Sequence, residues 1–113
     1  MKYMMLICAD NSVELSPADR AEMPSATEAW VTEMDSSGVR LLGTQLRPVE
    51  DATTVRVRDA EVLVADGPFA ETKEQIAGFD IVECADLDQA IDVAAKHPMA
   101  RFGSIEVRPF WQP

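Results

Sequence analysis

Two stretches of this chain, 2–9 and 76–84, are strand-like runs in which apolar residues occupy almost every position on both sides. A strand of this kind is usually a central one with both faces covered. Further strands are predicted at 39–46 and 103–110. Helical and hairpin segments between them give the order strand, helix, strand, hairpin, strand, helix, strand. Two helices on one side of a mainly antiparallel sheet predict an α+β fold, a ferredoxin-like βαββαβ plait with an extra β-hairpin.

The first helix is predicted to begin only after Pro24. Ser16 and Pro17 are typical of a helix start, because a hydroxyl can cap the first turn and proline suits the first helical position. Pro24 then interrupts the pattern, since it lacks the N–H that a helix interior needs. We therefore predict a short turn at 17–23, followed by a helix at about 25–37.

The second helix and the hairpin also carry clear local signals. Asp86 is a typical N-terminal cap, and Pro98 stops the helix at His97. The runs 53–58 and 61–65 are strand-like and flank a turn of about two residues, which predicts a β-hairpin. All 113 residues are expected to form one domain.

One face of such a sheet has no helix over it, yet the central strands are apolar on that side too. The simplest cover is the same face of a second copy, so we predict a homodimer whose sheets pack together. In the plait, the first and third long strands are antiparallel neighbours. Cys8 and Cys84 then lie at opposite ends, too far apart for a disulfide, and are expected to be inert thiols.

Composition excludes several classes of function. The formal net charge is −10 with no basic cluster, so binding to a phosphate backbone is not expected. No run approaches the ~18 apolar residues of a membrane span, and the N-terminal stretch is better explained as a strand than as a signal peptide. We expect a cytoplasmic protein. A single histidine without clustered cysteines offers no zinc pattern, and no cofactor is predicted.

The segment 66–75 is the candidate site, because its composition is richer than a plain connection needs. Asp66 loses its commonest local partner, since Pro68 has no N–H. The spacing of threonine and glutamine at the end of the segment predicts one helical turn at 72–75. The alternative is that the segment is only a rigid corner, with Asp66 as a structural cap.

Several charged residues are candidates for chemistry. If the protein is an enzyme, Asp66 would act as a base, with Lys73 or an arginine stabilising charge. Asp80 lies within an otherwise apolar strand, and a buried carboxylate is costly unless it is paired. It would either line a cavity between two copies or pair with Arg56 or Arg108. The ligand-binding candidates are Asp80, Phe69, Arg56 and Arg108, although surface pairing is the alternative for the arginines.

His97 is the only histidine of the chain and sits at the end of the second predicted helix. A cation at a helix C-terminus interacts favourably with the helix dipole. We therefore expect His97 to have a capping role.

Four segments together resemble the YCII-related, DGPF-domain family: KYMMLI at 2–7, TTVR at 53–56, DGPFAETKEQ at 66–75 and SIEVRP at 104–109. The resemblance covers nearly the whole chain and implies a dimeric α/β-barrel of ferredoxin-like subunits. Some DGPF members are encoded beside extracytoplasmic-function sigma factors, and some broader YCII-like members are thought to use a His–Asp pair. Asp66 matches the motif aspartate, but the first predicted helix contains no histidine. Asp80 also stands where an aromatic residue is usual in the family.

Two functions follow from these patterns. The first is binding of a small molecule in a cleft near Asp66 and the dimer interface, with lyase- or isomerase-like proton transfer if there is catalysis. The second is a non-catalytic regulatory or interaction module with a protein partner, such as a sigma factor. A pocket that joins Asp66 to a cation would favour the first, and an exposed apolar patch would favour the second.

Overall fold

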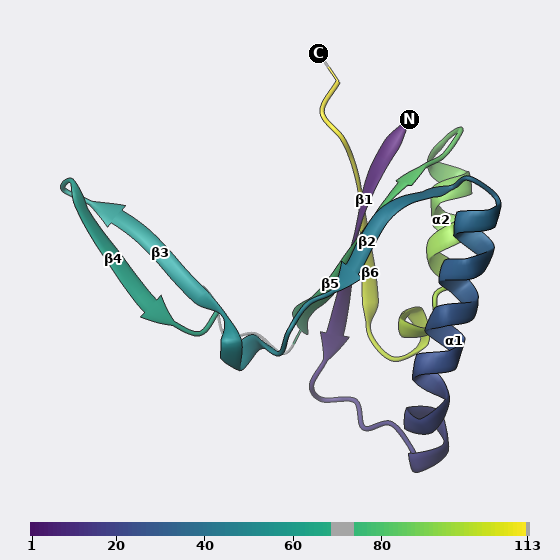
Figure 1. The fold of residues 1–113 in the computed structure, drawn as a ribbon, viewed down its shortest axis with the longest axis horizontal. Coiled ribbons are helices and arrows are strands. Elements are labelled where there is room, and N and C mark those ends of the chain that lie inside the picture. Colours follow the sequence, from purple (N-terminus) through teal and green to yellow (C-terminus); the bar gives the residue numbers. More distant parts are fainter. Residues whose placement is uncertain (69–73, 113) are drawn as a thin grey trace.

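The computed structural model describes residues 1–68 and 74–112. The described residues form a four-stranded sheet, a separate two-stranded hairpin and two α-helices. In Figure 1 the helices lie on one side of the sheet and the hairpin projects away from them. The elements in chain order are β1 (Lys2–Asp10), α1 (Pro17–Ser36), β2 (Arg40–Gln45), η1 (Val49–Asp51), β3 (Thr53–Arg58), β4 (Glu61–Asp66), β5 (Glu74–Glu83), α2 (Leu87–Ala95), η2 (Pro98–Arg101) and β6 (Ser104–Pro109). The predicted α+β class, with antiparallel strands and two helices, is confirmed.

The main sheet has the order β2-β5-β1-β6, and every neighbouring pair is antiparallel. The two long apolar strands are therefore central, as predicted. Cys8 pairs with Ile76 near one end of β1, whereas the amide of Cys84 donates to the Met1 carbonyl at the other end. Both thiols are free, which confirms that the two cysteines lie too far apart to bridge.

The core fills the space between the sheet and both helices. Alternate residues of the central strands point to the helical side, including Tyr3, Met5, Ile7 and Val82, and they pack with Trp30 and Met34 of α1 and Ala90, Val93 and Ala94 of α2. The indole Nε1 of Trp30 donates to the Val93 carbonyl over 3.0 Å, which joins the two helices and satisfies a buried donor.

Helix α1 is longer than the sequence pattern predicts, because Pro24 lies inside it. The helix begins at Pro17, with the Ser16 hydroxyl accepting from the Asp19 amide at 3.1 Å. Pro24 has no backbone N–H to donate, and a proline ring inside a helix crowds the carbonyl four residues earlier, here that of Arg20. The loss of one hydrogen bond nevertheless does not end a 20-residue helix that is anchored in the core by Trp30. The predicted turn at 17–23 is therefore wrong.

The hairpin of β3 and β4 has the predicted limits to within one residue and stands away from the rest of the molecule (Figure 1). Its two-residue turn, Asp59 and Ala60, has positive φ angles of 51° and 64°, as the mirror-image turns of tight hairpins require.

The predicted helical turn at 72–75 is wrong for Glu74 and Gln75, which begin β5. Thr72 and Lys73 lie outside the described residues.

Among the described residues, no helix or strand covers the side of the main sheet away from the helices (Figure 1). Met4 and Leu6 of β1 pair with Ile81 and Phe79 of β5, and all four side chains are half-buried there. Leu42 of β2 lies beside Ile81 and is 58% exposed. We call this surface the bare face.

Among residues 1–68 and 74–112, no helix combines the length and apolar character that a membrane crossing needs.

Candidate functional site

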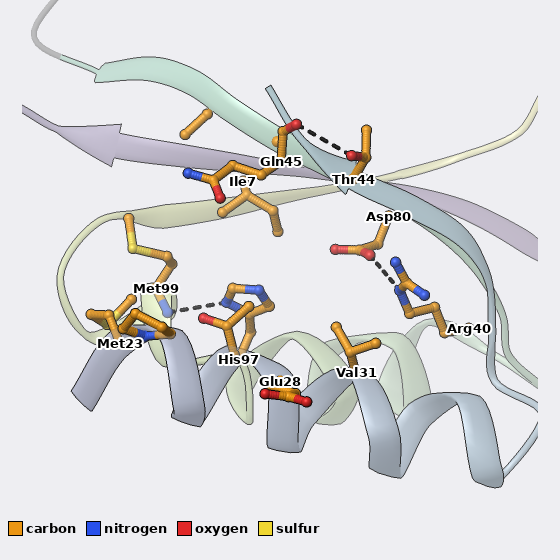
Figure 2. Close-up of a pocket in the computed structure, with 14 residues that line it drawn as sticks. Ile7, Met23, Glu28, Val31, Arg40, Thr44, Gln45, Asp80, His97 and Met99 are labelled. Atoms are coloured by element: carbon orange, nitrogen blue, oxygen red, sulfur yellow. Dashed lines mark hydrogen bonds and ion pairs between the residues drawn. The ribbon is translucent and has the colours of Figure 1, made fainter. Parts of the chain in front are cut away.

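A cavity of about 640 Å³ lies between α1, the helical side of the sheet and η2. Figure 2 shows side chains from all three elements pointing into it. Its apolar lining includes Ile7, Met23, Pro24, Val31, Ala77 and Met99, and its polar lining includes Thr27, Glu28, Arg40, Gln45, Asp80 and His97. A mostly apolar pocket with a few converging polar groups is the usual form of a small-molecule site.

Asp80 reaches the cavity because of its place in β5. It alternates with Val82, which faces the core, so its carboxylate points to the helical side and only 6% of the residue is exposed. Its cross-strand partner in β2 is Gly43. A methyl group on Gly43 would collide with the Asp80 carboxylate, so glycine is needed opposite this aspartate.

Arg40 holds the carboxylate in place. Its Nε donates to Asp80 Oδ1 at 2.7 Å, Nη1 donates to Asp35 Oδ1 at 3.1 Å, and Nη2 donates to the Gly43 carbonyl at 2.9 Å. An irregularity in the pairing of β2 and β5 between Arg40 and Leu42 accompanies this arrangement. Each nitrogen of the guanidinium therefore already has a protein acceptor.

The charges of this pair are set by competing effects. Burial raises the pKa of the Asp80 carboxyl, the hydrogen bond and the charge of Arg40 oppose that rise, and the nearby Asp35 adds to it. For Arg40, burial lowers the pKa, but the hydrogen bonds to Asp80 and Asp35 outweigh it and raise the pKa above the usual value. The guanidinium stays charged, whereas the Asp80 carboxyl binds a proton more readily than an ordinary aspartate.

His97 forms the other wall of the cavity and is 5% exposed. Its Nδ1 accepts from the Met99 amide at 3.1 Å, and its ring meets Trp30 edge-on with centroids 4.7 Å apart. Burial lowers the pKa of the ring to about 4, so it is neutral at pH 7. Because Nδ1 accepts a hydrogen bond, the single ring proton must be on Nε2.

The expected role of His97 as a cation on the helix dipole is therefore wrong. The ring does cap a helix, but it caps the 3-10 helix η2 as a neutral acceptor. Helix α2 ends earlier, at Ala95.

Two polar atoms of the site remain open to the cavity. Within the described part of the chain, no fully buried side-chain nitrogen or oxygen lacks a partner. The hydrogen bonds of Asp80 and His97 use Oδ1 and Nδ1, which leaves Asp80 Oδ2 and His97 Nε2 without partners among residues 1–68 and 74–112. These two atoms are therefore accessible, one as an acceptor and the other as an N–H donor, and Figure 2 shows both side chains on the cavity wall.

The predicted site residues that the structure describes do not form one site. Asp66 is the last residue of β4, is exposed at the base of the hairpin and is not among the described residues that line the large cavity. Arg56 is in the hairpin and Arg108 pairs with Glu106 on β6. Two other predicted residues, Phe69 and Lys73, lie outside the described residues.

Two expectations for Asp80 are corrected. Its cationic partner is Arg40, not Arg56 or Arg108. Its carboxylate faces the helices of its own chain, because it alternates with the half-buried residues of the bare face, so it does not line a cavity between two sheets.

A second hollow, of about 460 Å³, lies beside Pro68 and the start of β5. Its described lining includes Arg47, Asp51, Pro68, Glu74 and Ile76. Through Pro68 it lies close to Asp66, where a cleft was expected from the sequence. No cluster of three or more residues suited to a metal ion occurs in the described ranges.

Sequence reasoning missed Arg40 as a member of the site and misjudged His97. One signal for Arg40 was present: Gly43 inside a strand pattern indicates a close approach by another group. No comparable signal existed for His97, because its burial depends on the packing of η2 against α1 and Trp30.

Comparisons with known proteins agree with this architecture. An uncharacterized protein of Rhizobium meliloti is 40% identical over 102 residues, covering 75% of this chain and 82% of the relative. Among solved structures, 5-chloro-2-hydroxyhydroquinone dehydrochlorinase from Burkholderia phenoliruptrix, in complex with 2,5-dihydroxybenzoquinone, superposes with a TM-score of 0.51. That match has 12% sequence identity and covers 100% of this chain and 96% of the other, which shows a shared fold. The family model for the YCII-related domain matches residues 1–112. The chain therefore belongs to the YCII-related domain family.

Proposed function

We propose that the protein binds a small molecule in the cavity between α1 and the sheet, and that Asp80 transfers a proton there while His97 stabilises the negative charge that results. One observation carries the proposal. Two residues that are themselves almost fully buried, Asp80 and His97, each turn one accessible polar atom, a carboxylate oxygen and a neutral imidazole N–H, onto one mainly apolar cavity. A few polar groups that converge on a mainly apolar pocket can orient a bound small molecule.

The two groups have different chemical roles. Asp80 is the base: Oδ2 takes a proton from a substrate hydroxyl group on an unsaturated carbon, and its raised pKa makes it a stronger acceptor than an ordinary aspartate. The electron pair of the broken O–H bond stays on the oxygen, which becomes an oxyanion conjugated with the neighbouring carbon atoms. His97 donates its Nε2 hydrogen bond to that oxygen, because a neutral imidazole stabilises negative charge without giving up its proton.

The same intermediate leads to two outcomes. Return of the proton from Asp80 to a neighbouring atom gives an isomerisation, and loss of a leaving group gives a lyase reaction. By analogy, the dehydrochlorinase with the same fold supports the lyase outcome, and the molecule bound in its structure is a hydroxylated ring compound.

The proposal is tested with a thermal-shift screen of a metabolite library against wild type, Asp80→Asn and His97→Asn. Compounds that stabilise the wild type are expected to lose most of that effect in both variants. Asp66→Asn is the matched control, because Asp66 lies outside the cavity lining. Stabilisation that survives in Asp80→Asn but disappears in Asp66→Asn would contradict the proposal and favour a site beside segment 66–75, with Asp66 and Lys73 as its acid–base groups.

We also propose that the chain forms a homodimer of ferredoxin-like plaits through the bare face. The strand order and the apolar residues Leu6, Leu42, Phe79 and Ile81 on the uncovered side support this arrangement. Sedimentation at micromolar concentration tests this arrangement. A dimer is expected for the wild type, and a monomer whose bare face is exposed to solvent would contradict the proposal.

A second candidate function is a protein-interaction module, and the hairpin favours it. Val55, Val57, Val62 and Val64 lie on one face of β3 and β4 and are 57–65% exposed. Apolar patches of this kind mark contact surfaces. A sigma factor as the partner stays a prediction from the family resemblance. Replacement of Val62 and Val64 by threonine should weaken partner binding and leave small-molecule binding unchanged.

A further inference from the structure

We infer that the cavity selects a ligand with an apolar body and a polar head that donates hydrogen bonds and carries no negative charge. This inference rests on the proposed function and names the class of molecule that the site accepts. It follows from the charges around the cavity, from its two open polar atoms and from its apolar walls.

The charges around the cavity disfavour an anion. Arg40 is the cation among the described lining residues, and each of its three guanidinium nitrogens already donates to the protein. Against this single positive charge stand Asp80 and Glu28 on the lining and Asp35 directly behind Arg40. The chain as a whole carries a net charge of −10. An anionic head would meet like charge without a cation free to receive it.

The two open atoms specify the head group further. Asp80 Oδ2 can accept a hydrogen bond from a ligand, and His97 Nε2–H can donate one to a ligand. A hydroxyl group satisfies either atom, and an amine satisfies the carboxylate. A carboxylate head offers only acceptors, so it leaves Asp80 Oδ2 unpaired as well as repelled.

The remaining walls specify the body of the ligand. Ile7, Val31, Met23 and Met99 give it apolar surface, and methionine side chains adapt readily to flat rings. A cavity of about 640 Å³ lies in the range of small-molecule sites and admits one or two rings.

The test uses three probes with the same apolar body: 2-phenylethanol, 2-phenylethylamine and phenylacetate. Each is titrated into the full chain, and binding is followed by amide chemical shifts of lining residues such as Val31, Ala77 and Met99. The alcohol or the amine is expected to bind at least roughly tenfold more tightly than phenylacetate. Asp66→Asn should keep this preference, because Asp66 lies outside the lining.

A second variant separates charge from shape. Asp80→Asn keeps the size of the side chain but removes its negative charge. The positive charge of Arg40 is then balanced by Asp35 alone among its two carboxylate partners. In this variant phenylacetate should gain affinity relative to the wild type and the amine should lose it.

The outcomes distinguish the two proposals. If phenylacetate binds the wild type as tightly as the alcohol and the amine, the inferred ligand class is wrong, but small-molecule binding in the cavity stands. If none of the three probes shifts the lining amides at millimolar concentration, binding in this cavity is contradicted, and the inferred class falls with it.

Discussion

Replacement of Arg40 by methionine should destabilise the protein far more than loss of an ordinary ion pair. Only 15% of the Arg40 side chain and 8% of the Asp80 side chain are exposed. Removal of one partner of a buried pair leaves an uncompensated charge and costs about 3–5 kcal/mol. We expect about 3 kcal/mol, the lower end, because Asp80 Oδ2 is open to the cavity and can be hydrated. That is a large part of the roughly 5–15 kcal/mol by which a domain is stable.

The assay is urea unfolding at pH 7, followed by circular dichroism and by the fluorescence of the buried Trp30. Arg47→Met is the matched control, because Arg47 also pairs with an aspartate, Asp51 at 3.0 Å, but has an 85% exposed side chain. Such a surface pair contributes about 0–1 kcal/mol.

Two further measurements identify the cause. The double variant Arg40→Met with Asp80→Asn should recover much of the lost stability, because no charge is then left buried without a partner. The deficit of Arg40→Met should also shrink as the pH falls. Asp80 already has a raised pKa in the folded chain, and loss of Arg40 raises it further, so the folded variant gains protons before the unfolded chain does. The reasoning is refuted if Arg40→Met costs no more than Arg47→Met.

Three other predictions follow from the same geometry. Gly43→Ala should cost about 1–3 kcal/mol in urea unfolding, since its methyl group displaces the Asp80 carboxylate; an unchanged midpoint would show that the strand adapts. The stability of the wild type relative to His97→Asn should fall by up to about 3 kcal/mol as the pH drops from about 6.5 to 4. The reason is that the unfolded ring binds a proton in this pH range, whereas the folded ring, with a pKa of about 4, does not. Parallel pH profiles of the two proteins would disprove the buried neutral ring. Ile81→Lys on the bare face should give a folded monomer by sedimentation, and a persistent dimer would exclude that face as the interface.

The fold was predictable where the signal is local or strictly periodic. The apolar runs of β1 and β5 predicted central strands, and Asp86 predicted a helix start that the structure bears out. Ser16 also has the side chain of a helix cap and does cap α1, although the helix was predicted to begin only after Pro24. Pro24 was misjudged because helix propensity is local, whereas the anchoring of α1 through Trp30 is tertiary. The limits of β5 were missed because Glu74 and Gln75 are paired with β1 across the sheet.

The site was predictable only in part. Asp80 was recognisable because a carboxylate within an apolar run requires a partner. The identity of that partner depends on the irregularity of β2 near Arg40 and on the space above Gly43, neither of which the sequence displays. His97 is brought to the cavity by a 3-10 helix that packs against α1, so its burial and its tautomer follow from tertiary contacts.

The most direct test of the account is ¹⁵N nuclear magnetic resonance of the imidazole ring, because His97 is the only histidine in the chain. At pH 7 we predict a neutral ring protonated on Nε2, with an Nε2 resonance that shifts when a compound from the thermal-shift screen binds. A ring that is charged at pH 7 or protonated on Nδ1, or ring resonances that stay unchanged while a ligand is bound, would contradict a functional cavity between α1 and the sheet.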